Sequence, residues 1–177
     1  MSYILLSISG HDRARIVCDV SESLLHLNAN IEDSSMTALR GRFTMMLIVK
    51  LAETTALGEL KAALAELEQR TGLTVQSQSI SDEEASIVPQ EPDCVITVSG
   101  ADKAGIVHAV TGVLASNGVS IVDVSTRARE TEHGDVYMMA LEIISGGNGE
   151  SLRTPLQAVA KEFGIDIEIH ELDAAVM

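Results

Sequence analysis

Tryptophan is absent from this 177-residue chain, and tyrosine and phenylalanine occur only twice each. Basic residues are also scarce, because 12 Lys and Arg stand against 26 Asp and Glu and leave a formal net charge of −14. Affinity for nucleic acid comes mainly from cations that neutralise phosphates and, for single strands, from aromatic rings that stack on bases. The composition therefore argues against direct binding to nucleic acid.

Long apolar runs and catalytic motifs are missing as well. No apolar run reaches the roughly 18 residues of a membrane span, and the first residues lack the pattern of a secretory signal. The histidines share no spacing with cysteine or carboxylate that is typical of metal ligands, and no Gly-x-Ser-x-Gly nucleophile motif occurs. We therefore expect a cytoplasmic, noncatalytic protein with no membrane partner, no metal and no cofactor.

The most informative feature present is an internal repeat. Residues 9–17 have the sequence SGHDRARIV, and 90 positions later residues 99–107 have the sequence SGADKAGIV. At the same offset, Val20, Leu24, Ile31, Asp33 and Ser35 recur as Val110, Leu114, Ile121, Asp123 and Ser125. Each copy is large enough for a small core. We predict two similar domains, at 1–80 and 93–177, joined by an acidic, proline-containing linker at 81–92 that favours extended backbone.

Each copy follows the order strand, helix, strand, strand, helix, strand, judged from apolar periodicity. The first copy places these elements at 3–9, 16–27, 31–39, 43–51, 57–72 and 73–80, and the second at 94–99, 103–117, 119–129, 136–144, around 152–163 and at 165–172. Residues 40–42 are predicted to form a hairpin turn. In the second copy 130–135 replace it, three residues longer, so that Met138 and Met139 align with Met45 and Met46.

This order predicts an α+β fold made of two ferredoxin-like βαββαβ domains, each an antiparallel sheet with both helices on one face. The other face of each sheet stays bare, and a large bare apolar face is unusual for a monomer. We expect it to be covered, which favours a homo-oligomer. Pairing of the two domains with each other, edge-to-edge pairing and dimerisation are all open at this point.

Cysteine and methionine positions give two smaller expectations. Cys18 and Cys94 occupy non-equivalent places in the two copies, so neither a duplicated disulfide nor a paired metal site is indicated. We expect both to be small, buried apolar side chains in a reduced protein. One methionine of each pair on the strands is expected in the core, because neighbouring strand residues face opposite sides.

The chemistry of the repeat lies where the first strand turns into the first helix. Gly100 is expected to permit a sharp turn, Asp102 and its counterpart Asp12 to cap the helix, and Gly105 to keep the first helical turn free of bulk. Such a loop exposes backbone N–H groups at the positive end of a helix dipole, which suits a carboxylate. The alternative is that these residues only build a turn and an N-cap.

These motifs resemble those of the ACT domain family. The stretch 100–107, GADKAGIV, is similar to the loop of that family, and 117–121, NGVSI, is similar to its entry into the second strand. The first copy carries NANIEDSSM at 28–36, which resembles the glycine cleavage system transcriptional repressor family, whose members consist of two ACT domains and little else. The resemblance covers nearly the whole chain.

The resemblance implies a small effector, commonly an amino acid such as glycine or serine, held between two domains against this loop and the start of the second strand. The candidate ligand-binding residues by position are Gly10, His11, Asp12, Ala14, Asn30 and Ile31 in the first copy and Gly100, Asp102, Ala104, Gly105, Ile106 and Ser120 in the second.

The chain departs from the family pattern at several of these positions. Ala14 and Ala104 replace a proline, and Ser120 replaces the strand asparagine. Arg15 replaces a glycine and is expected to block the first loop or lie at the surface, although it could instead pair with a ligand carboxylate. We hypothesise one site between the domains that combines the open second loop with Asn30 of the first.

The function implied by the resemblance is that of a sensor that binds an amino acid and regulates a protein partner. In the repressor family this partner is a DNA-binding transcription factor for glycine cleavage genes. Two alternatives stay open: a regulatory ACT subunit of a metabolic enzyme, and a structural adaptor that binds no ligand.

Overall fold

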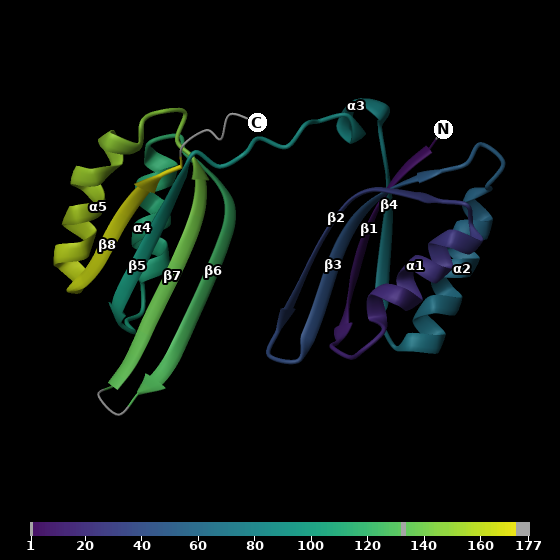
Figure 1. Cartoon of the computed structure of the whole chain (residues 1–177), viewed down its shortest axis with the longest axis horizontal. Helices are drawn as coiled ribbons and strands as arrows, with labels where there is room; N and C mark the ends of the chain where they lie inside the picture. The colour runs from purple at the N-terminus through teal and green to yellow at the C-terminus, as the bar shows by residue number, and fades with distance from the viewer. Residues whose placement is uncertain (1, 132–133, 173–177) are drawn as a thin grey trace. The chain divides into compact units, whose positions relative to one another are not determined.

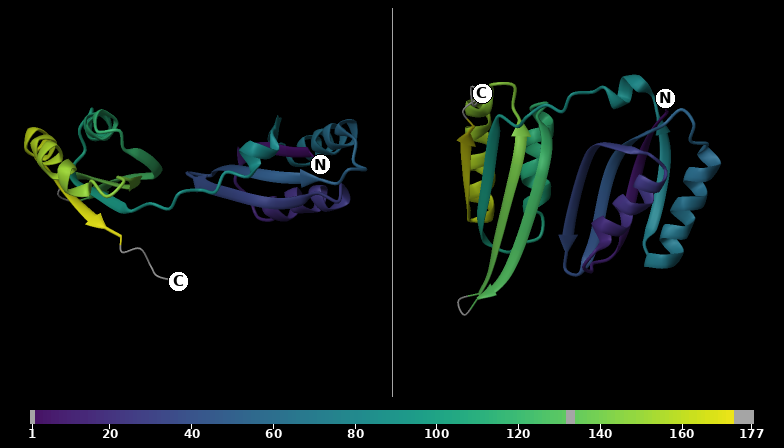
Figure 2. Two further views of the ribbon diagram at one scale, coloured as in Figure 1. Left: turned by 90° about the horizontal axis from the view of Figure 1, so that it is seen from above. Right: turned by 45° about the vertical axis from the view of Figure 1, so that its right-hand side comes forward.

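The structure, a computed structural model, describes residues 2–131 and 134–172, and it divides into two compact units, Met1–Val88 and Pro89–Met177 (Figure 1). Each unit holds one four-stranded antiparallel sheet and two helices that cover one face of it (Figure 2). The repeated sequence thus forms the same α+β, ferredoxin-like fold twice, which confirms the predicted fold class.

The two units share one strand order, in which the first strand is central. The first unit contains β1 (Ser2–His11), α1 (Ile16–His26), β2 (Asn30–Leu39), β3 (Arg42–Leu51), α2 (Leu57–Thr71) and β4 (Thr74–Ile80), in the sheet order β2-β3-β1-β4. The second contains β5 (Cys94–Ala101), α4 (Ile106–Ser116), β6 (Ser120–Thr131), β7 (Gly134–Ile144), α5 (Gly149–Phe163) and β8 (Ile165–Glu171), in the order β6-β7-β5-β8.

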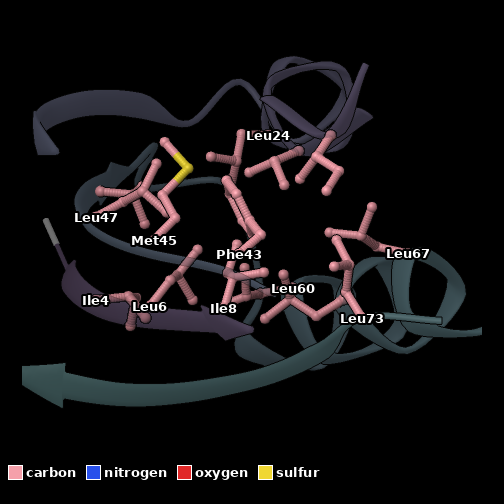
Figure 3. Packing of buried hydrophobic residues seen from close by; sticks show 14 of the residues in the cluster. Ile4, Leu6, Ile8, Leu24, Phe43, Met45, Leu47, Leu60, Leu67 and Leu73 are labelled. Carbon is pink, nitrogen blue, oxygen red and sulfur yellow. The ribbon is translucent and has the colours of Figure 1, made fainter. Parts of the chain in front are cut away.

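Each unit has its own hydrophobic core between the sheet and its helices. In the first, alternate β1 residues face inward and are at most 2% exposed, as the period of a strand with one buried face requires. Figure 3 shows Leu24 of α1 above Phe43 and Met45 of β3, and Leu60 and Leu67 of α2 beside them. A second, separate cluster built from β5, β7, α4 and α5 fills the other unit.

Strand β2 differs from the other strands of its sheet because it contributes nothing to the core. It lies at the sheet edge, and all ten of its residues are exposed. Its pairing with β3 shifts register between Ile31 and Asp33, and β6 repeats the shift between Ile121 and Asp123. The two copies therefore share even this local irregularity, a β-bulge.

The β2–β3 hairpin closes through Arg40 and Gly41, both with positive φ (47° and 74°), as a two-residue turn of the I′ type requires. In the second unit the strands continue to Thr131 and from Gly134, so most of the predicted loop at 130–135 is strand, and Glu132 and His133 lie outside the described residues. Ile8 pairs with Met45 and Val98 with Met139, so this hairpin is longer by four residues, not three.

The predicted linker is not extended throughout. It contains a short helix, α3 (Asp82–Ala85), after the end of β4. Ser81 accepts a hydrogen bond from the Glu84 N–H at 3.1 Å, and the Glu84 carboxylate accepts one from the Ser81 N–H at 2.8 Å. This reciprocal capping box stabilises a helix turn that the prolines further along the linker do not disturb.

The cysteine expectation holds for one residue and fails for the other. Cys94 is buried, and burial raises the pKa of its thiol, whereas Cys18 is exposed. Cys18 lies between Ile16 and Val20 on α1, and those two carry the buried face of the helix. The methionine expectation is confirmed, since Met45 and Met139 are buried while their neighbours on the same strands are about half exposed.

No helix in the described part of the chain is both long enough and apolar enough to cross a membrane.

Candidate functional site

The repeated loop joins the end of β1 to α1 in the first unit and the end of β5 to α4 in the second. Both helices begin after a residue in the left-handed conformation, Arg15 at φ 74° and Gly105 at φ 99°. Those residues, and not Asp12 and Asp102, occupy the N-cap positions, so the predicted aspartate caps are wrong. The aspartates lie three residues too early, because helical backbone starts only at Ile16 and Ile106.

Neither helix start is capped by a side chain of the described residues. The first backbone bonds within the helices run from the Asp19 N–H to the Arg15 carbonyl and from the Ala109 N–H to the Gly105 carbonyl, each at 2.9 Å. The N–H groups of the three residues before each of these donors point out of the helix end. The loop thus presents backbone N–H groups that can donate hydrogen bonds to an anion.

Gly10 and Gly100 have a packing role and do not form the expected sharp turn. Both lie inside strands, paired with Phe43 and Tyr137 respectively. A Cβ on Gly100 would stand 2.7 Å from Cγ2 of Ile165 and 3.1 Å from its Cα, and a Cβ on Gly10 would stand 2.6 Å from Cδ2 of Leu73. Glycine therefore leaves room for Ile165, the first residue of β8, and for Leu73, which directly precedes β4.

The first loop carries a cationic cluster around one buried carboxylate. An Arg13 guanidinium nitrogen lies 2.6 Å from the Asp19 carboxylate, and this hydrogen bond holds the pKa of Asp19 below its ordinary value, with smaller contributions from the charges of Arg70 and Arg15. An open hollow of about 140 Å³ adjoins the cluster. Its lining residues are Asp12, Arg13, Arg15, Ile16, Val17, Cys18, Met36 and Phe43.

The second loop is free of such cations at its helix start. The Lys103 ammonium is turned away and donates to the Phe163 carbonyl at the end of α5, where a cation suits the helix dipole. Burial raises the pKa of the Tyr137 hydroxyl, and the negative charge of Asp102 adds a smaller rise.

Sequence reasoning missed Phe43, which lines the hollow at the first loop, and its buried counterpart Tyr137. Phe43 and Tyr137 are structural equivalents, since Phe43 pairs with Gly10 on β1 and Tyr137 pairs with Gly100 on β5. Their positions next to the hairpins could have revealed this equivalence. The repeat alignment, however, assumed a second hairpin longer by three residues instead of four, and it therefore matched Tyr137 with Thr44. Met36 of β2, a further lining residue, is about half exposed beside Phe43.

The strand residues of the candidate site do not meet the loop within a unit. Asn30 lies opposite Lys50, which pairs with Tyr3 near the start of β1, whereas the loop follows His11 at its end. Eight residues of strand separate the two places, about 26 Å at a rise of about 3.3 Å per residue. Ser120 is likewise opposite Ile144, near the start of β5. A single amino acid cannot contact both places in one unit.

The remaining candidate residues differ in exposure, because some lie at the surface and one is buried in the core. Ala14 and Ala104 are exposed in the loops, and Ile31 is 38% exposed on β2. Ile106 is 1% exposed, so its side chain belongs to the core and only its backbone faces the loop. His11 lies beside Arg42, with 3.1 Å between the ring Nε2 and a guanidinium nitrogen, and the Asn30 amide donates to Glu32 at 2.9 Å.

A model of the ACT domain family matches residues 2–78 and again residues 93–170 of this chain. The chain belongs to the ACT domain family. Among curated relatives, a UPF0237 protein of Methanopyrus kandleri is 37% identical over 76 residues, which cover 42% of this chain and 84% of the relative. A UPF0237 protein of Listeria monocytogenes is 42% identical over 62 residues, or 34% of this chain and 70% of the relative.

Two solved structures resemble this chain over nearly its whole length. One is an unknown protein from Galdieria sulphuraria, with 30% identity, a TM-score of 0.78 and coverage of 97% of this chain and 98% of that one. The other, named as a proposed glycine cleavage system transcriptional repressor, has 17% identity and a TM-score of 0.70 over 97% of each chain. At that identity the second likeness concerns the fold.

Proposed function

We propose that this ACT protein is a noncatalytic sensor that binds a small amino acid and controls a protein partner. The observation that carries the proposal is the start of α4, where Gly105 at φ 99° leaves the donors of the first helical turn uncapped and without a side chain over them. The helix dipole favours a carboxylate there by about 0.3 to 1 kcal/mol. The exposed Asp102 supplies the negative charge that an amino group requires.

The regulatory role we propose is control of transcription of the glycine cleavage type. It is supported by the likeness in fold to a protein named for that role and by the tandem layout. With a net charge of −14 the chain is a poor ligand for DNA, so the effect would pass through a DNA-binding protein in the cytoplasm. A coupling of about 1 to 3 kcal/mol between amino acid and partner suffices for such a switch.

The first test is a thermal-shift comparison of the full chain with glycine, serine and the other common amino acids at millimolar concentration. A ligand that binds only the folded state raises the melting temperature, and saturation at about 100 times the dissociation constant adds about 2.7 kcal/mol. A selective rise with glycine or serine supports the proposal. If no amino acid raises the melting temperature, the sensor function is wrong.

The second test locates the site by calorimetry with the amino acid that gives the rise. Gly105→Arg places a cation and bulk over the start of α4, and Gly105→Ala is its matched control. The control introduces the same backbone strain, but its Cβ would meet only Phe163 at 3.6 Å. We expect Gly105→Arg to weaken binding well beyond Gly105→Ala.

Asn30→Ala tests the strand residue in the same assay. Lower affinity in this variant would place the strand asparagine in the ligand site, as the sequence pattern predicts. Unchanged affinity in both Gly105→Arg and Asn30→Ala would mean that the amino acid binds elsewhere.

A further inference from the structure

The loop and the hairpin of the first unit meet at one end of the sheet, as the ribbon shows (Figure 1). The Asp12 N–H donates to the Gly41 carbonyl at 2.9 Å, which ties the loop to the hairpin turn. His11 and Arg42 face each other across β1 and β3. Arg13, Arg15, Arg40 and Arg42 therefore gather at this end, which we call the arginine end.

The arginine end is unusual in so acidic a chain. It holds four of the twelve basic residues, and residues 1–80 as a whole carry nine acidic against seven basic residues. Arg13 is neutralised by Asp19. For Arg15, Arg40 and Arg42 no ion pair with a carboxylate is found among the described residues. Their three guanidinium charges outnumber the exposed carboxylate of Asp12, which lines the same hollow, so this end keeps a positive surplus.

Arg15 and Arg40 also stand where the backbone prefers another residue. Both have positive φ, 74° and 47°, a conformation that costs a residue with a Cβ about 1 kcal/mol. In the second unit the position equivalent to Arg15 is occupied by Gly105, which adopts a positive φ without this cost. The hairpin turn and the start of α1 require these backbone conformations but do not require arginine, so the local fold does not explain the two charges.

Apolar surface lies directly beside these charges. The hollow next to Arg13 and Arg15 is walled by Val17 and Met36, which are 43% and 51% exposed, with Phe43 as its floor. Leu39, on β2 next to the hairpin turn, is 66% exposed. A partner for this surface must therefore combine negative charge with at least one apolar side chain.

We propose that the arginine end is a docking surface for an acidic peptide segment of a protein partner, with an apolar side chain of that segment seated in the hollow. The inference rests on the proposed function only in that the protein works through a partner. Guanidinium groups bind carboxylates through paired, charge-assisted hydrogen bonds. A nucleic-acid strand fits less well, because it would run beyond this end into the field of an otherwise acidic protein.

The test is a fluorescence anisotropy titration of the full chain with a short labelled peptide that has glutamates on both sides of a central Leu-Phe pair. The double variant Arg15→Gly, Arg40→Gly removes two of the three cations without a carboxylate partner, at positions where the backbone accepts glycine. Its folding stability should therefore equal or exceed that of the wild type, and thermal unfolding checks this. The matched control is Lys61→Gln, which removes an exposed cation on α2.

We expect the double variant to weaken peptide binding about tenfold or more, and Lys61→Gln to change it less than about twofold. Replacing Leu-Phe by Ser-Ser in the peptide should also weaken binding. The proposal is overturned if the wild type does not bind the peptide, if the double variant binds it equally well, or if Lys61→Gln weakens it as much.

A labelled DNA strand of equal charge serves as the competing probe. Tighter binding of that strand than of the peptide, lost in the same double variant, would assign the surface to nucleic acid and overturn the proposal. The titrations contain no amino acid, so their outcome is independent of the effector tests at Gly105.

Discussion

Glycine meets two different steric demands at the residue scale of the repeated loop. Gly10 and Gly100 leave the space that Leu73 and Ile165 occupy, whereas Gly105 supplies a positive φ. Arg15 meets the second demand despite its side chain. Both copies thus have glycine where a Cβ would overlap a neighbour. They differ at the start of the first helix, where the positive φ is adopted by Arg15 in one copy and by Gly105 in the other.

Gly100→Ala should destabilise the second unit by about 1 to 3 kcal/mol, because the new Cβ overlaps Ile165 and the backbone of β8 must move. The free energy of unfolding in urea measures the loss. Gly58→Ala is the control, since Gly58 lies in α2 with nothing within 4 Å of an added Cβ. That change should stabilise by about 0.5 to 1 kcal/mol. An equal loss in both variants would contradict the packing argument.

The sequence was a good guide to elements and a poorer guide to single side chains. Periodicity located the two main helices and four strands of each unit because Ile16, Val20 and Leu24 and their counterparts mark one buried face, but it missed the short exposed helix α3. It could not place Asp12, because the cap position depends on the φ of Arg15 three residues later. It also could not show that Asn30 and the loop lie at opposite ends of β1, because that separation follows from strand register.

Among the connections between elements, the loop from β7 to α5 is held by one carboxylate, that of Asp93. Asp93 accepts hydrogen bonds from the Ser145 N–H at 2.7 Å, the Ser145 hydroxyl at 3.1 Å and the Gly147 N–H at 3.2 Å. The bond from the Ser145 backbone is the main cause that lowers the pKa of Asp93. The ionised carboxylate therefore stabilises the fold above its unfolded-state pKa, and this contribution is lost as the pH falls through the lower, folded-state value.

Asp93→Asn should lower the stability of the second unit at pH 7 and flatten the decline in stability below about pH 4. Urea unfolding at a series of pH values measures both effects. Asp166→Asn, an exposed change on β8, is the control and should leave the stability at pH 7 nearly unchanged. A decline in acid as steep as that of the wild type would show that Asp93 does not carry this pH dependence.

The whole molecule consists of two units with a complete core each. Among residues 2–131 and 134–172 the two clusters have no residue in common, so pieces 1–88 and 89–177 should each fold alone and unfold cooperatively. Circular dichroism melts and amide spectra of the separate pieces check this. A piece that stays unfolded would show that its stability requires the rest of the chain, and it would also overturn the predicted domain boundaries.

The acidic surplus of the chain opposes aggregation through the exposed edge strand β2. Ser34–Leu39 present uncharged side chains and the outer backbone groups of a sheet edge, an arrangement that invites strands of other molecules to add on. Mutual repulsion between molecules with a charge of −14 opposes such growth at neutral pH. Near the isoelectric point of about 4.6 the net charge and its repulsion vanish. We therefore expect molecules to associate through this edge and to precipitate at that pH.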